Sequence, residues 1–237
     1  MNNIRIVNLG KVNSTVNERL DMLAVDIPQP EPLVTIRQSE EPTLYVPKEL
    51  APNKQIDVSK IPADVKVVYR PTKTRHGFIF TDDDVISVMI MQTNLDGKMI
   101  ENEFIRSAVE VLKTRGIIAG RGRYRLNSND IVFRKDGKEK KFCGMIWIKD
   151  KNRLGLMLTL KFNVDKVPGL FTVMPGKYPR NVKEITDVVG GLKEADPTIG
   201  PSIVDQILEN MFRRIGWNVV GKELTAAENE YLGIVAG

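Results

Sequence analysis

Hydrophobic and polar positions change their spacing several times along the chain, and each change predicts a new element. Near the N-terminus, short apolar runs alternate with proline-marked turns. Residues 33–37 and 43–46 have the β-branched and aromatic content of strands, with a Glu-Glu-Pro turn between them. Residues 16–25 carry apolar side chains at helical spacing, and Ser14 or Thr15 is the expected N-cap.

The next stretch is rich in β-formers before it changes to helical spacing. Residues 65–69, 77–80 and 85–91 are predicted strands, and a basic loop joins the first two. Residues 100–115 place their apolar side chains on one helical face, and Gly116 is expected to close that helix.

A second β block and two helices complete the pattern. Strands are predicted at residues 130–133, 142–148 and 154–162, with an Asp-Gly hairpin turn between the first two. Helices are predicted over residues 182–192, capped by Asn181, and from Ser202 to Gly216. Strands and helices are mixed without strict βαβ alternation. The pattern therefore predicts an α+β fold with mixed or antiparallel sheets flanked by helices.

Composition agrees with one globular domain and excludes several classes of protein. The 237 residues are 42% hydrophobic and include a single cysteine, which excludes a disordered chain and a disulfide scaffold. No stretch approaches the roughly 20 apolar residues of a membrane span. We therefore expect a cytoplasmic protein without a membrane partner. Thirty-five basic against 30 acidic residues give a net charge of +5, which is too small to predict nucleic-acid binding.

The common catalytic motifs are absent from the sequence. It has no phosphate-binding glycine loop, no G-x-S-x-G and no H-E-x-x-H. With His76 and Cys143 as the sole His and Cys, a His/Cys metal site is excluded. Activation of a carboxylate by ATP stays open, because it needs mainly backbone amides, one or two fixed cations and an acidic metal ligand.

One segment carries a resemblance to a known family. Asn129 and Asp130 precede an apolar residue, a basic hairpin follows, and Lys141-x-x-Gly144 enters an apolar strand. This arrangement resembles the biotin/lipoate protein ligase family, and within it the lipoate–protein ligase A branch.

The resemblance extends loosely over most of the chain. Asn17 and Asp21 match an Asn-x-x-x-acid helix, residues 37–46 are similar to the family's early hairpin, and residues 177–187 resemble its basic, helix-opening segment. It implies a class II synthetase-like catalytic domain over residues 1–237. The family's small accessory C-terminal domain would then be absent or supplied by a second polypeptide.

The resemblance also implies an activity and a set of roles. Lipoate or octanoate would attack the α-phosphate of ATP, and a lysine on a lipoyl-domain acceptor protein would then take the acyl group from the adenylate. Lys141 would be the catalytic cation at the acyl-phosphate junction. Asn129 and Asp130 would face the adenylate, and Asp130 would help to hold Mg²⁺ or orient the incoming amine. The strand after Gly144 would line the acyl tunnel.

The sequence departs from the family at the glycine-rich substrate loop. Arg70, Thr72 and Gly77 are assigned to substrate and adenylate binding together with Arg75 and His76, and the last two fill two of the family's three glycine positions. Either the pocket is rebuilt around a different acid, or ligation is lost. The alternative function is therefore a catalytically degenerate member of the fold that serves as a protein-binding or assembly module.

Each singled-out residue also has a plainer interpretation. Lys141 could lie at a solvated hairpin tip, Asn129 and Asp130 could initiate a turn, and His76 could be an exposed loop residue. Cys143 is more simply a buried core residue than a thioester nucleophile. Arginines 121, 123 and 125 could bind phosphate or an acidic lipoyl domain, or form a solvated strand face. Biotin–protein ligase is a third function, because Gly-Arg-Gly-Arg before Tyr124 partly echoes its biotin-binding motif.

Overall fold

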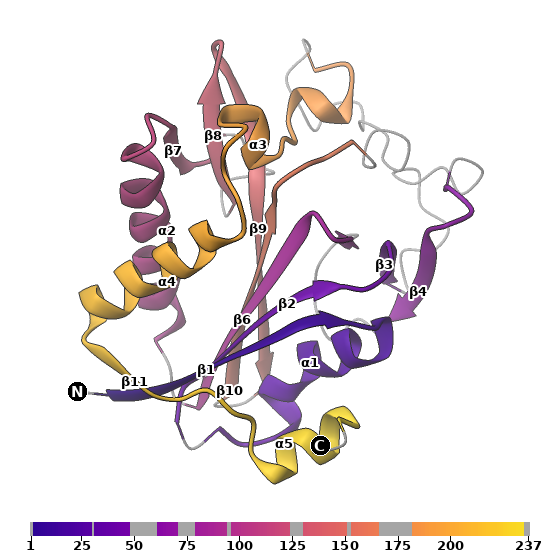
Figure 1. Cartoon of the computed structure of the whole chain (residues 1–237), viewed down its shortest axis with the longest axis vertical. Helices are drawn as coiled ribbons and strands as arrows, with labels where there is room; N and C mark the ends of the chain where they lie inside the picture. The colour runs from indigo at the N-terminus through magenta and orange to yellow at the C-terminus, as the bar shows by residue number, and fades with distance from the viewer. Residues whose placement is uncertain are drawn as a thin grey trace.

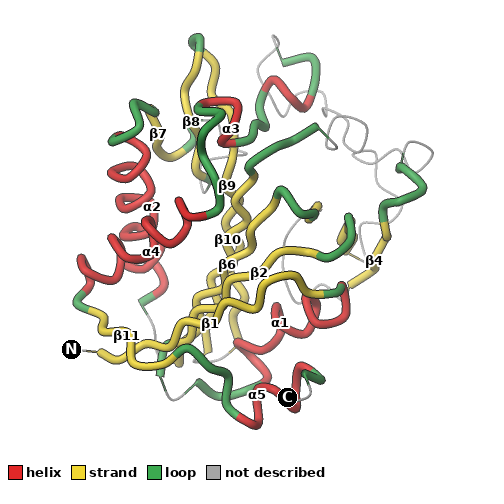
Figure 2. The backbone as a smooth tube through the Cα atoms, viewed as in Figure 1, coloured by secondary structure: helices red, strands yellow, loops and turns green. Residues whose placement is uncertain are grey.

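The computed structural model describes residues 2–29, 31–47, 61–70, 79–93, 96–123, 130–150, 153–165 and 182–234. A large sheet runs through the middle of the molecule, with helices on both faces and a small sheet to one side (Figures 1 and 2). This arrangement confirms the predicted α+β class with mixed sheets. None of the described helices combines the length and the hydropathy of a membrane span.

Within the described ranges, eight strands form the large sheet in the order β11-β1-β2-β6-β10-β9-β8-β7. The first three strands are parallel to one another, and every later neighbour is antiparallel. The strands are β1 (Asn2–Val12), β2 (Leu33–Ser39), β6 (Val85–Thr93), β7 (Ile118–Arg121), β8 (Ile131–Lys135), β9 (Lys138–Asp150), β10 (Arg153–Lys161) and β11 (Trp217–Gly221).

The small sheet has the order β4-β3-β5, with β3 parallel to β4 and antiparallel to β5. Its strands are β3 (Thr43–Pro47), β4 (Lys66–Arg70) and β5 (Ile79–Thr81). The strands predicted at residues 33–37 and 43–46 are confirmed, but they belong to different sheets and do not pair. The expected early hairpin over residues 37–46 is therefore wrong, because each strand finds its partners elsewhere.

Helices cover both faces of the large sheet (Figure 1). Helices α2 and α4 pack against each other on one face, whereas α1 and the small sheet lie on the other face. The side chain of Asn13 caps α1 by accepting a 3.0 Å hydrogen bond from the amide of Val16, so the predicted cap at Ser14 or Thr15 is wrong. The helices are α1 (Ser14–Asp26), α2 (Gly97–Lys113), the 3₁₀ turn η3 (Ile185–Asp187), α3 (Leu192–Ala195), α4 (Ser202–Ile215) and α5 (Ala226–Leu232).

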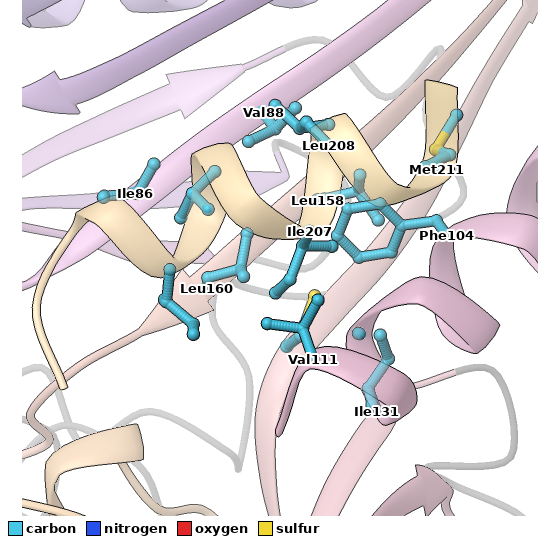
Figure 3. Packing of buried hydrophobic residues seen from close by; sticks show 14 of the residues in the cluster. Ile86, Val88, Phe104, Val111, Ile131, Leu158, Leu160, Ile207, Leu208 and Met211 are labelled. Atoms are coloured by element: carbon cyan, nitrogen blue, oxygen red, sulfur yellow. The ribbon is translucent and has the colours of Figure 1, made fainter. Parts of the chain in front are cut away.

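The largest apolar core lies between the sheet and the α2/α4 layer. Figure 3 shows Ile207 and Met211 of α4 close to Phe104 of α2 and Leu158 of β10. All four side chains are fully buried. The predicted helix from residue 202 is confirmed. The apolar residues that recur at helical spacing are those on the face of α4 that packs into the core.

The helix predicted over residues 182–192 is wrong, and its cap at Asn181 lies outside the described residues. The described part holds only η3 and the single turn α3. Between them, Val188 and Gly190 exchange backbone hydrogen bonds with Lys141 of β9. An extended segment can make these bonds and a helix cannot, so strand pairing overrides the helical pattern.

The C-terminal strand and helix pack against the N-terminal strand and helix. Strand β11 pairs in parallel with β1, and α5 packs on α1. Both guanidinium Nη atoms of Arg5 in β1 lie 2.8 Å from the Glu228 carboxylate of α5. Tyr231 adds a 2.5 Å hydrogen bond to Asp26 at the end of α1. The hydrophobic pattern predicted none of β1, β11 and α5.

Candidate functional site

The β8–β9 hairpin carries the centre of the candidate site. Asp136 and Gly137 form its turn with φ of 50° and 74°, the two left-handed residues that an Asp-Gly type I′ turn requires. Farther from the turn, the register of the two strands slips by one residue at Phe142, directly after Lys141. Such a bulge bends the strand and redirects the neighbouring side chain.

The backbone of Lys141 is held on a second side. Its amide donates a 2.8 Å hydrogen bond to the carbonyl of Val188, and its carbonyl accepts a 3.0 Å bond from the amide of Gly190. This short segment lies beside β9 near the point where β10 ends at Lys161. The position of Lys141 is therefore fixed by its backbone as well as by its side chain.

The side chain of Lys141 forms an ion pair with Asp130. Its ammonium Nζ lies 2.8 Å from Oδ2 of Asp130, and the two side chains are 30% and 9% exposed. The other oxygen, Oδ1, accepts a 3.4 Å hydrogen bond from the amide of Met145. The solvated hairpin tip considered for Lys141 is therefore wrong, because its charge lies against a buried carboxylate at the base of the hairpin.

Gly144 provides the surface over which Lys141 lies. A Cβ atom added to Gly144 would lie 3.4 Å from both Cε and Nζ of Lys141, and 2.9 Å from Oγ1 of Thr159 on β10. A side chain at this position would thus displace the catalytic candidate or its neighbour. The sequence placed Lys141, Asp130 and Gly144 at one site, and the structure brings these three residues together.

A row of small and polar residues crosses four strands at the level of Gly144. The register places Arg37 of β2 opposite Ser87 of β6, Ser87 opposite Thr159, and Thr159 opposite Gly144. The next row on the same face is mostly apolar, with Met89, Met157 and Ile146 side by side. A boundary between apolar and polar surface therefore runs across this face of the sheet.

At the β2 end of this row, Arg37 belongs to a buried hydrogen-bond network that includes residues of α1. Arg37 donates hydrogen bonds to the side chains of Asn17 and Asp21, which lie one turn apart on α1. Asn17 in turn donates a 2.9 Å bond to the hydroxyl of Tyr45 in the small sheet. Burial, followed by the charge of Asp21, raises the pKa of that hydroxyl. The Asn-x-x-x-acid pattern thus joins α1 to both sheets through Arg37.

Lys161 is the second cation on this face, and the sequence interpretation missed it. It is the last residue of β10, on the same face as Thr159 two residues earlier. Burial, followed by the charge of Lys141, lowers the pKa of the Lys161 ammonium to about 8. A lysine at the end of a mostly apolar strand was the available signal, but only the strand register shows that it lies near Lys141.

Other site predictions have different outcomes. The backbone of Arg70 ends β4, and its side chain is not described. Five further predicted positions lie outside the described residues: Thr72, Arg75, His76, Gly77 and Asn129. Cys143 is fully buried, and burial raises the pKa of its thiol to about 12, which agrees with the structural interpretation.

The arginines near β7 are engaged in ion pairs. Arg121 lies 2.6 Å from Glu101, and Arg123 lies 3.0 Å from Glu139, whereas Arg125 is outside the described residues. Both described arginines thus have carboxylate partners within the protein, while their side chains are 36% and 73% exposed.

The described ranges contain no group of three or more His, Cys, Asp or Glu side chains that could hold a metal ion. Asp130 is one carboxylate of the described site that could contact a metal ion. Such a ligand suits Mg²⁺ that arrives with phosphates, because Mg²⁺ commonly uses one or two carboxylates together with phosphate oxygens and waters.

Comparison with known proteins gives no match in sequence and a clear match in structure. No protein-family model matches the chain, and a search of curated proteins found none. Lipoate-protein ligase A bound with ATP superposes with a TM-score of 0.78 at 12% identity, covering 98% of this chain and 93% of that one.

Two similar structures come from Thermoplasma acidophilum. A bi-partite lipoate protein ligase, described together with its E2 lipoyl domain, gives a TM-score of 0.77 at 12% identity and covers 98% of this chain and 91% of that one. Ta0514, a candidate lipoate protein ligase with bound lipoic acid, gives 0.76 at 11% identity, with coverage of 98% and 94%.

The chain has the lipoate–protein ligase fold. This confirms the fold that the short Asn-Asp and Lys-x-x-Gly motifs implied. Within this ligase fold, the described part of the site consists of Lys141 paired with Asp130 above Gly144, with Thr159 and Lys161 on the neighbouring strand.

Proposed function

We propose that this chain is a lipoate– or octanoate–protein ligase or transferase that acts through an acyl-adenylate. The observation that carries the proposal is the fixed ammonium of Lys141, which Asp130 holds directly above Gly144. A preorganised cation over a side-chain-free surface suits a reaction in which negative charge develops on a bound oxyanion. Because the similar structures are lipoate protein ligases, we take lipoate and related medium-chain acids as the substrate class.

The reaction has two steps in this proposal. A carboxylate oxygen of the acid attacks the α-phosphorus of ATP, and the bond to pyrophosphate breaks. The neutral amine of an acceptor lysine then attacks the acyl carbon, and AMP leaves with the electrons of the carbon–oxygen bond while the amine loses a proton. The charge of Lys141 stabilises the oxyanion in both steps.

Other groups of this face have roles that follow from their positions. Asp130 orients Lys141 and is the described carboxylate that would hold Mg²⁺, which would neutralise phosphate charge. The half-buried Ile146, one row from Gly144, offers apolar surface to the methylenes of the acid. The acceptor would be a lipoyl domain. A separate accessory subunit is a further proposed partner, because one of the similar structures is a bi-partite lipoate protein ligase.

The test is calorimetric titration of the purified chain with ATP·Mg²⁺ and octanoate, lipoate or biotin in turn, together with a pyrophosphate assay. Tight binding of octanoate or lipoate with pyrophosphate release supports the proposal, and a preference for biotin would contradict it. Lys141→Met should abolish acyl transfer to a lipoyl domain. Lys138→Met removes an exposed charge from the same hairpin and should keep the activity.

A non-catalytic module of the same fold is the alternative, and the filled glycine positions at Arg75 and His76 favour it. A well-folded chain that gives no heat with any of the three acids, and that captures a lipoyl domain or another protein, would replace the ligase proposal with this one.

A further inference from the structure

Lys161 lies on the site's face of the sheet and has no role in the mechanism above. It ends β10 opposite Val85 of β6. Its chain neighbours Leu160 and Phe162 point into the core on the opposite face. Alternation along the strand therefore directs Lys161 to the face of Thr159, whose Oγ1 borders Gly144.

This ammonium lies near a second cation and forms no ion pair of its own within the described ranges. The charged side chains that act on Lys161 are Lys141, which repels it, and Asp130 and Asp82, which attract it. Asp130 is already paired with Lys141 at 2.8 Å. Among the described residues, no carboxylate or carbonyl oxygen lies within hydrogen-bond distance of the Lys161 ammonium.

Such an arrangement costs the folded protein stability. A partly buried cation without a close partner loses hydration, and a second cation beside it adds repulsion. The lowered pKa of Lys161 reflects these same two causes. Local arrangements that oppose stability are expected at functional positions, where a ligand supplies the missing interaction.

We propose that Lys161 is a second anion-binding group of the site, which holds a substrate oxyanion together with Lys141. The anion is the carboxylate of the acid before activation or the phosphoryl group of the nucleotide. Both are oxyanions that accept charge-assisted hydrogen bonds from an ammonium. The choice of these two anions rests on the proposed function, whereas the assignment of Lys161 as an anion-binding group does not.

The variant Lys161→Met keeps the length and the apolar stem of the side chain and removes its charge. Loss of one charge-assisted hydrogen bond should weaken binding of the anion roughly 10- to 100-fold. Lys161→Arg keeps the charge and should recover most of the affinity. Lys11→Met is the matched control. Lys11 is an exposed lysine of β1, and strands β2 and β6 separate β1 from β10 in the sheet.

The experiment is calorimetric titration of wild type and the three variants with octanoate alone and with AMP alone, accompanied by thermal unfolding. Weaker binding of octanoate identifies the carboxylate as the anion, and weaker binding of AMP identifies the phosphate. The melting temperature of Lys161→Met should equal or exceed that of wild type, because the change removes an unpaired charge.

Three results would overturn the inference: wild-type affinity for both ligands in Lys161→Met, weaker binding accompanied by a drop of several degrees in melting temperature, or a wild type that binds neither ligand. The first leaves the ligase proposal standing, and so does the last if ATP·Mg²⁺ with octanoate or lipoate still releases pyrophosphate. Conversely, Lys161-dependent binding of AMP or octanoate without pyrophosphate release on addition of ATP·Mg²⁺ supports the anion site and contradicts the ligase.

Discussion

Replacing Gly144 by alanine tests the geometry on which the candidate site depends. The added Cβ would lie 2.9 Å from Oγ1 of Thr159, about 0.5 Å inside the 3.4 Å at which ordinary contact begins, and 3.4 Å from Nζ of Lys141. Because Gly144 lies on a strand paired on both sides, the backbone has little room to yield. The clash therefore falls on Thr159, and the added methyl group also contacts Lys141, so that any shift of the methyl group away from Thr159 moves Lys141.

The expected cost divides between stability and activity. Overpacking of this kind destabilises a folded protein by about 1–3 kcal/mol. A displacement of Lys141 by about 1 Å would reduce acyl transfer on the order of 100-fold. Denaturant unfolding measures the first effect, and transfer of a radiolabelled acid to a lipoyl domain measures the second.

Two second-site variants identify the clash. Thr159→Ala removes Oγ1 and should restore about 1 kcal/mol of stability to Gly144→Ala, measured as a double-mutant cycle. Thr159→Val keeps a methyl group at the Oγ1 position and should restore much less. A Gly144→Ala protein with wild-type stability and wild-type transfer would refute the placement of Lys141 and Thr159 against Gly144.

Four further predictions concern the core, the Arg5–Glu228 pair and Cys143. Ile207→Ala or Phe212→Ala should lower the free energy of unfolding by about 2–5 kcal/mol through a core cavity, and a much smaller loss in urea unfolding would contradict the packing of α4. Arg5→Met should cost about 3 kcal/mol, because it leaves the carboxylate of Glu228, 1% exposed, without its partner. Burial raises the pKa of Glu228, but hydrogen bonds from Arg5 and Thr225 outweigh it, so the folded-state pKa lies below the reference value of 4.5. The pair's contribution is therefore complete above pH 4.5 and is lost as pH falls through the folded pKa, so Glu228→Gln should flatten the acid side of a stability–pH curve. Cys143 should not react with a thiol reagent at neutral pH until the protein is unfolded in guanidinium, and rapid labelling of the native protein would show that it is accessible.

Elements with a strong local signal were predictable from the sequence. The apolar positions of α4 recur at helical spacing because one face of the helix meets the core, so pattern and packing agree. The Asp136-Gly137 turn was predictable because its two left-handed residues restrict the choice of amino acids. Strand β11 has no comparable signal: it is five residues long, and its stability comes from pairing with β1, more than 200 residues earlier.

The candidate site shows the same division between local and distant information. Lys141 and Gly144 were found because they lie three residues apart and form a recognisable motif. Arg37 and Lys161 were missed because their relation to that motif depends on strand register, which the sequence does not display. The helix expected over residues 182–192 failed for a related reason, since its partner is the backbone of Lys141.

The pairing of β1 with β11 has a consequence for synthesis of the protein. Strand β1 leaves the ribosome more than 200 residues before β11, the strand that covers its outer edge. Until then, β1 presents an uncovered row of amides and carbonyls, which is a template for pairing with another nascent chain. A contact of such long sequence separation also slows folding. Aggregation during expression should therefore depend on how soon residues 217–221 reach β1, and lower temperature or a chaperone that binds the nascent chain should raise the soluble yield.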